Sequence, residues 1–216
     1  MAKHLFLEGP IQSGKSTLIK NCLQEFGVTL GGFSCKRYLD ENGSIRAFGL
    51  VSPTDFDVDG VYDPQIHGDP DNGIPSKDPG IFLIKGSAGM KADTDAFIRA
   101  GIRLLDEPKH ADLILMDEIG GVELMSDEFH EKLYEILAGD IPCIGVLKQQ
   151  THAKVMQKHH GGEPGPEKAD GIIRANEQLR KDIVGKYGGI IVPFDRDSIE
   201  DARQTVMQFL KEKASV

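Results

Sequence analysis

The residues best suited to chemistry are a short run of glycine, lysine and hydroxyl side chains near the N-terminus. Gly9, Gly14, Lys15 and Ser16 fit the pattern G-x-x-x-x-G-K-[ST]. Consecutive backbone N–H groups that lead into a helix N-terminus form a concave anion site, and glycines let that backbone approach phosphates closely. We therefore expect residues 9–17 to bind the phosphates of a nucleotide.

Each part of this P-loop has an expected role. The Lys15 ammonium would neutralise charge on the β- and γ-phosphates, and the Ser16 hydroxyl would bind Mg²⁺. The four variable positions would act mainly through their backbone. The residues expected around the phosphates are Gly9, Pro10, Ile11, Gln12, Ser13, Gly14, Lys15, Ser16 and Thr17.

The segments on either side of the loop argue against a chance match to the pattern. The apolar run Leu5–Leu7 before it is typical of a buried strand. Apolar residues follow it at helical spacing, and Gly27 is placed to end that helix. Strand, loop and helix are the setting that the motif requires.

A pair of acids lies within the second informative stretch, residues 112–121, which read DLILMDEIGG. The four apolar residues predict a central parallel strand, and Asp117 and Glu118 at its end predict a Walker B motif. Asp117 would hold Mg²⁺, directly or through water. Glu118 points differently and could orient or deprotonate the water that attacks the γ-phosphate. Strands often end in polar residues, but the position downstream of a P-loop strengthens the assignment.

Several other polar residues are weaker candidates. Residues 142–147 read as a buried strand beside the Walker B strand, and the polar residues after it could sense the γ-phosphate or form an ordinary loop. These are Lys148, Gln149 and His152. Four arginines could each be a surface charge or an arginine finger: Arg174, Arg180, Arg196 and Arg203. The adjacent pair His159-His160 suggests a metal, but no spaced carboxylate or cysteine completes a site there.

Composition limits the class of protein. The chain has 216 residues and 39% hydrophobic content, enough for one sizeable core. Its net charge of −9 makes nucleic acid and anionic membranes poor partners. Glu8 interrupts the first apolar run, so no signal peptide is expected, and no run is long enough to span a membrane. Three cysteines without a C-x-x-C pair indicate a reducing, cytoplasmic setting.

The elements between the two motifs should position them. Gly31 and Gly32 break an apolar run, and residues 33–39 and 45–51 then read as an antiparallel hairpin with an Asn-Gly turn. Lys36 and Arg37 on this hairpin could reach a phosphate or a base, or be ordinary exposed charges.

Residues 52–80 differ from the rest in being rich in proline and aspartate. We expect a long acidic insertion that is mobile and that could be a lid, a partner surface or neither. Within it, Asp55, Asp57 and Asp59 have the spacing of a calcium loop's start. Its twelfth position is Ile66 instead of the required glutamate, which argues against calcium.

The remaining chain alternates short apolar strands with amphipathic helices. Strands are expected at residues 81–84, 170–174 and 189–192, with a loop at 86–89. Helices are expected from Asp93 or Thr94 to Pro108, after Ser126, over 176–186 and after Ser198. This order predicts a single α/β domain, residues 1–216, with a mostly parallel sheet covered on both faces. Ligands of such sheets bind at the carboxyl ends of the strands, where both motifs fall.

The quoted stretches together resemble one family. FLEGPIQSGKSTLIK, GGFSCKRY, DLILMDEIGGVELMSDEFHEKLYEIL and IPCIGVL are similar, in this order, to the small P-loop nucleoside-triphosphatases, the thermophilic and cancer-related nucleoside-triphosphatase family. The resemblance implies a RecA-like α/β core and Mg²⁺-dependent hydrolysis of ATP, GTP and other nucleoside triphosphates with low base selectivity. It implies phosphate binding by residues 9–17 and assigns Asp117 and Glu118 to magnesium and water.

The chain departs from the family pattern at two basic positions. Gly121 stands where a lysine is common, and Glu177 follows Asn176 where an arginine is common. If those cations stabilise charge, their loss predicts tight binding with slow turnover.

Two other function classes compete with a triphosphatase. One is a nucleotide-dependent switch or regulatory module with slow hydrolysis, for which residues 52–80 would be the surface for a protein partner. The other is a small-molecule or nucleotide kinase, which residues 52–80 disfavour because they contain no arginine for a lid. A regulatory GTPase is disfavoured because the chain has no Asn-Lys-x-Asp motif.

Overall fold

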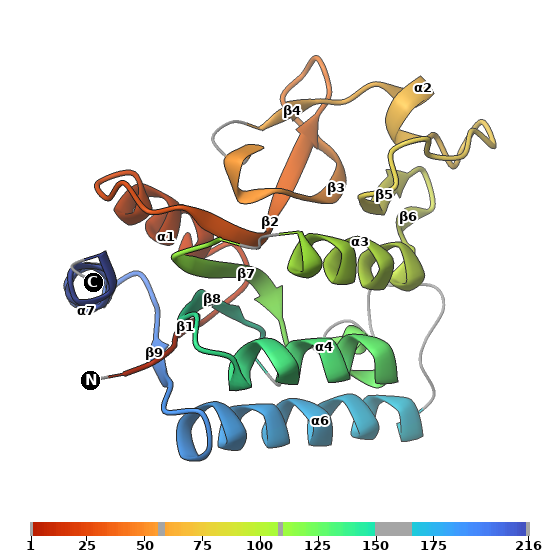
Figure 1. Ribbon diagram of the computed structural model, residues 1–216. Helices are drawn as coiled ribbons and strands as arrows, with labels where there is room; N and C mark the ends of the chain where they lie inside the picture. The colour runs from red at the N-terminus through yellow and green to blue at the C-terminus, as the bar shows by residue number, and fades with distance from the viewer. Residues whose placement is uncertain (1, 56–58, 108–109, 150–165, 215–216) are drawn as a thin grey trace.

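The computed structural model describes residues 2–55, 59–107, 110–149 and 166–214 (Figure 1). The strands are β1 (Leu5–Glu8), β2 (Leu30–Leu39), β3 (Ile45–Val51), β4 (Gly60–Val61), β5 (Ile81–Gly86), β6 (Gly89–Ala92), β7 (Leu113–Ile119), β8 (Cys143–Leu147) and β9 (Ile190–Pro193). The helices are α1 (Lys15–Leu23), α2 (Pro64–His67), α3 (Thr94–Asp106), α4 (Asp127–Ala138), α6 (Pro166–Gly185) and α7 (Ile199–Ala214), with 3-10 turns η1 (Pro53–Asp55) and η2 (Val122–Met125).

The strands that carry the two motifs belong to one parallel region. Its order is β2-β7-β8-β1-β9, so β8 separates the P-loop strand β1 from the Walker B strand β7. The predicted parallel arrangement is thus confirmed. All these strands end at the same edge, which brings the P-loop and Asp117 together.

The second half of β2 joins an antiparallel extension of the sheet. It pairs with β3, and β3, β5 and β6 continue the antiparallel order. The predicted hairpin is confirmed, but the break expected at Gly31 and Gly32 is wrong. The strand runs through both glycines, and Gly32 adopts a left-handed backbone conformation that only glycine takes readily, with a φ of 85°. A Cβ there would lie 2.2 Å from the Leu115 carbonyl oxygen, so glycine is what allows β2 to approach β7.

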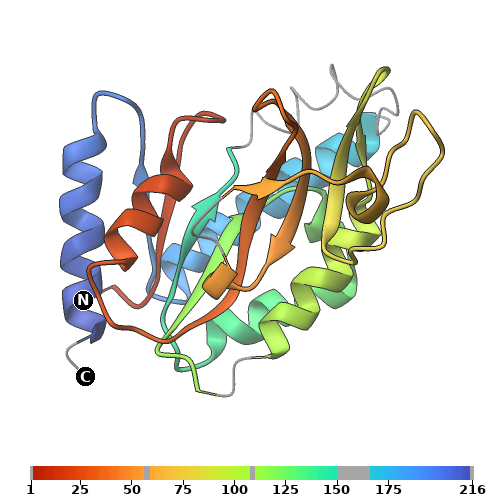
Figure 2. The same cartoon turned by 90° about the horizontal axis from the view of Figure 1, so that it is seen from above.

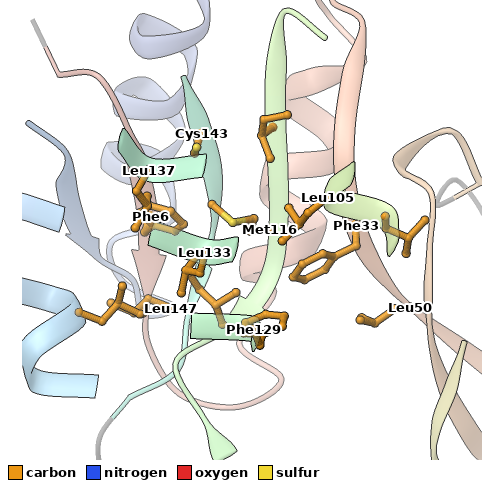
Figure 3. Close-up of a cluster of buried hydrophobic side chains, with 14 of the residues drawn as sticks. Phe6, Phe33, Leu50, Leu105, Met116, Phe129, Leu133, Leu137, Cys143 and Leu147 are labelled. Carbon is orange, nitrogen blue, oxygen red and sulfur yellow. The ribbon is translucent and has the colours of Figure 1, made fainter. Parts of the chain in front are cut away.

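Helices cover both faces of the parallel region. Figures 1 and 2 show α1 and α7 on one face and α3, α4 and α6 on the other. Alternation along β1 explains this: Leu5 and Leu7 belong to the cluster with α1 and α7, whereas Phe6 belongs to the cluster with α4. Figure 3 shows Leu133 and Leu137 of α4 beside Phe6. The side chains on both faces of the parallel sheet are buried, as the apolar strands predict.

Some predicted boundaries are wrong. The strand expected at residues 170–174 lies inside α6. The loop expected at 86–89 is confirmed, as the tight turn of the β5–β6 hairpin. Helix α1 ends at Leu23, before the predicted Gly27. The predicted caps at Asp93 and Ser126 are confirmed, since their side chains accept the N–H groups of Ala96 and Phe129.

The acidic insertion carries short elements that pack on the hairpin. Strand β4 pairs in parallel with the end of β2, and α2 follows it. The buried His67 ring lies 4.1 Å from the Tyr38 ring and 5.8 Å from the Tyr62 ring, between centroids. Of the residues expected in a calcium loop, Asp57 lies outside the described part, and Asp59 pairs with Arg37. Within the described residues no group of three or more acids, histidines and cysteines is placed to hold a metal ion.

A helix that spans a bilayer needs about 20 consecutive, mostly apolar residues. In the described ranges, none of the helices could cross a membrane.

Candidate active site

The P-loop has the backbone shape that its sequence predicts. It leaves β1 at Glu8 and enters α1 at Lys15, with Gln12 and Gly14 in the left-handed region at φ values of 57° and 102°. No side chain caps α1, so the first backbone N–H groups of the helix have no internal partner there. This open helix N-terminus is suited to bind an anion.

Gly9 lies in a close backbone contact with the segment after β9. A Cβ on Gly9 would lie 1.9 Å from the carbonyl oxygen of Phe194, and the Phe194 N–H donates to the Glu8 carbonyl at 2.7 Å. This contact fixes where the loop departs from the sheet. The first glycine of the motif is therefore required for a steric reason as well as for phosphate binding.

Lys15 is buried and folds back on the loop. Its ammonium donates to the carbonyls of Gly9 at 3.0 Å and Pro10 at 2.5 Å, and to the Ser13 hydroxyl at 3.3 Å. Burial lowers the Lys15 pKa, although the nearby carboxylates of Glu118 and Asp117 act in the opposite direction. The loop thus surrounds a cation at the centre of the predicted phosphate site.

Ser16 and Asp117, the two predicted magnesium ligands, are in contact. The Ser16 hydroxyl donates to the Asp117 Oδ1 at 2.6 Å, and the Cys35 N–H donates to its Oδ2 at 3.4 Å. Burial, and secondly the Glu118 carboxylate, raise the Asp117 pKa to about 6. A hydroxyl and a carboxylate are hard oxygen donors of the kind Mg²⁺ binds while keeping waters, so the pair fits that ion.

Glu118 leaves the register of its strand. The pairing of β7 with β8 shifts between Asp117 and Ile119, so Glu118 is the extra residue of a bulge. Bulges re-aim side chains and are common beside active sites. The charge of Glu118 acts to raise the pKa of both the Lys15 and the Lys148 ammonium groups, although burial outweighs it at Lys15.

The structure separates the weaker candidates. Lys148 directly follows β8, and its N–H donates to the Ile119 carbonyl at 2.8 Å. Arg180 pairs with Glu8, and Arg203 pairs with Glu25 at 2.9 Å. Arg37 is held by Asp59 through two hydrogen bonds of 2.9 Å, which favours the structural interpretation of that charge.

Three other weak candidates, Arg174, Arg196 and Gln149, show no such contacts among the described residues. Arg174 and Arg196 are exposed, and Gln149 is half-buried. His152 and the pair His159-His160 lie outside the described residues.

Sequence reasoning missed two buried polar residues behind the Walker B strand. Glu123 is 1% exposed and accepts the Gly121 N–H at 2.7 Å. Asn176 is also 1% exposed and donates to the carbonyls of Gly120 and Lys148 at 2.7 and 3.0 Å. The Asn176 contact has no local sequence signal, because Asn176 and Gly120 are 56 residues apart.

A cavity lies away from the P-loop. Its volume is about 490 Å³, and it lies between the insertion, β5 and α3, lined by residues such as Pro75, Phe82 and Arg99. The P-loop site is assigned from the chemistry of its side chains and from its backbone shape.

The comparisons with known proteins agree with this geometry. A family model described as NTPase matches residues 87–184. The nucleoside-triphosphatase THEP1 of Thermococcus kodakarensis is 26% identical over 69% of this chain and 78% of its own. The cancer-related nucleoside-triphosphatase homolog of Mus musculus is 28% identical over 64% of this chain and 70% of its own.

Two solved structures share the fold. The crystal structure of THEP1 from the hyperthermophile Aquifex aeolicus matches with a TM-score of 0.56 and 14% identity, covering 96% of this chain and 98% of its own. The solution structure of a human cancer-related nucleoside triphosphatase matches with a TM-score of 0.55 and 19% identity, covering 98% of each chain.

The sheet order, the P-loop and the acidic pair at the end of β7 define a P-loop nucleotide-binding α/β protein. Within that class, the family model, the two relatives and the two solved structures agree: this chain is similar to the small P-loop nucleoside-triphosphatases.

Proposed function

We propose that this chain is a Mg²⁺-dependent nucleoside-triphosphatase that hydrolyses ATP, GTP and other nucleoside triphosphates to diphosphate and phosphate. The observation that carries the proposal is the 2.6 Å contact between Ser16 and Asp117. It brings the metal ligands of two motifs together at the edge where Lys15 is buried and Glu118 is re-aimed. The phosphates, the metal ion and the attacking water would then bind at one site.

The residues divide the work as follows. The P-loop N–H groups and Lys15 bind and orient the β- and γ-phosphates, and Ser16 and Asp117 hold the metal ion. Mg²⁺, when bound, neutralises charge that develops on the phosphate oxygens. Glu118 accepts a proton from the attacking water. Low base selectivity follows because every group assigned a role addresses the phosphates. Three unpaired cysteines support a reducing compartment such as the cytoplasm.

The test is phosphate release from ATP, GTP, CTP and UTP with Mg²⁺, with nucleotide binding titrated on the same proteins. Wild type should hydrolyse all of them. Glu118→Gln should bind nucleotide and lose turnover by about 10²-fold or more. Lys15→Ala should lose binding. Tight binding without phosphate release by wild type would contradict the enzyme and favour a nucleotide-dependent switch.

A further inference from the structure

Lys148 is a cation held beside the reacting groups without an assigned role. It follows β8, the strand between the P-loop strand and the Walker B strand, at the edge where both motifs end. Its backbone N–H donates to the Ile119 carbonyl at 2.8 Å, just beyond the bulge at Glu118. The position of Lys148 is therefore tied to the segment that carries Glu118.

A set of buried contacts holds this segment in place. Asn176 donates to the carbonyls of Gly120 and Lys148, and so joins the ends of β7 and β8 from α6. Glu123 accepts the Gly121 N–H with one oxygen, and its other oxygen faces the Lys148 ammonium. A side chain so deeply buried needs its charge paired, and Lys148 supplies the opposite charge.

The Lys148 ammonium is held loosely. Its distance to Glu123 Oε2 is 3.4 Å, longer than the roughly 2.7–2.9 Å of a strong charge-assisted hydrogen bond. The Glu123 side chain is 2% exposed and that of Lys148 is 21% exposed, so the ammonium is the partner that reaches toward solvent. An ammonium has three donors. Among the described side chains only Glu123 accepts from it, which leaves donors for a ligand.

The charge of Lys148 is maintained despite its surroundings. Burial alone would lower the pKa of this ammonium, but the carboxylates of Glu123 and Glu118 outweigh burial and raise it. The Phe97 ring, with its centroid 5.2 Å from the Lys148 Nζ, adds a favourable face for a cation. The group is therefore a positive charge just after β8, at the edge of the sheet where the P-loop and Glu118 also lie.

We propose that Lys148 is a further catalytic residue, which places its ammonium on the γ-phosphoryl group in the transition state, and that Glu123 is its positioning residue. The inference rests on the proposed function and deepens it. Phosphoryl transfer spreads negative charge over the equatorial oxygens, and a preorganised cation lowers the barrier by stabilising that charge. Lys148 would thus supply in cis the charge that an arginine finger supplies elsewhere.

The test compares Lys148→Met with Lys132→Met. Lys132 is the matched control because its side chain is 19% exposed and is also ion-paired, to Asp106 and Glu135, away from the P-loop. Lys148→Met should lower phosphate release by about 10²–10³-fold. It should keep the MgADP affinity of wild type but lose the extra affinity for MgADP with aluminium fluoride, a transition-state mimic. Lys148→Arg should recover part of both, and Lys132→Met should match wild type.

Glu123→Gln tests the positioning role, because glutamine still accepts the Gly121 N–H but carries no charge. It should reduce turnover less than Lys148→Met, and the double variant should be no slower than Lys148→Met alone.

The inference is overturned if Lys148→Met hydrolyses at the wild-type rate, or if MgADP and the mimic lose affinity equally, because equal losses mean uniform binding. If wild type itself releases no phosphate, the proposed function fails separately. The mimic titration then still decides the role of Lys148.

Discussion

Gly9 illustrates how much of the site is local. Its motif, together with the strand before it and the helix after it, predicts the P-loop because the loop backbone and its helix are built from consecutive residues. What the motif does not predict is the Phe194 carbonyl that lies against Gly9 from the far end of the chain. That contact depends on β9 pairing with β1, which no short pattern encodes.

Gly9→Ala tests this contact. A Cβ would lie 1.9 Å from backbone, which cannot move as a flexible side chain could, so we expect destabilisation by about 1–3 kcal/mol and weaker nucleotide binding. Urea unfolding measures the first effect. Gly27→Ala is the control, because nothing lies within 4 Å of its Cβ position, and its stability should change by less than about 1 kcal/mol. Equal midpoints for the two variants would contradict the steric argument.

Among the elements, α6 is the one that sequence patterns predict least well. Residues 170–174 are apolar enough to suggest a strand, yet they continue a helix whose buried face packs on the sheet. The amphipathic pattern of the longer segment, and not the short apolar run, determines the secondary structure, because the helix can pack its apolar side on the sheet. The same helix brings Asn176 to the ends of β7 and β8, a role that depends on tertiary packing.

Asn176→Asp tests this tie. The change keeps the shape but replaces the NH₂ donor, which faces two carbonyls, by oxygen. We expect a loss of about 1–3 kcal/mol for each carbonyl left unpaired. Gln178→Glu makes the same chemical change on the exposed side of α6, where the cost should stay below about 0.5 kcal/mol. If both variants unfold at the wild-type urea concentration, Asn176 does not hold the two strands.

The insertion is a second element for which composition and structure differ. Its prolines and aspartates predict a mobile loop, but His67 is buried between two tyrosine rings and its Nδ1 accepts the Asp63 N–H at 2.8 Å. His67→Ala should therefore speed backbone hydrogen exchange in residues 62–80 and leave nucleotide affinity unchanged. Gln65→Ala, on the exposed side of α2, should change neither. Complete exchange of this segment in wild type would instead favour a mobile loop.

At the scale of the whole molecule, one buried histidine links three elements that are distant in the sequence. His4 is fully buried beside β1, accepts the Cys143 N–H with Nδ1 at 3.0 Å and donates from Nε2 to the Leu137 carbonyl at 3.1 Å. These contacts require the neutral ring, because a protonated Nδ1 would direct a second N–H at the Cys143 N–H. Burial, and secondly the charge of Lys3, lower the His4 pKa to about 4.

This shift sets the direction of a pH effect on global unfolding. Between a pH of about 6.5 and about 4 the unfolded chain binds the His4 proton and the folded chain does not, so stability is complete above this range and is lost as pH falls through it. Between pH 7.5 and 5.0 the loss from His4 should be about 2 kcal/mol by urea unfolding. His4→Gln should remove that part of the pH dependence, whereas His110→Gln, in an exposed turn, should keep it. Parallel stability curves for His4→Gln and wild type would mean that the His4 ring accepts its proton while the fold is intact.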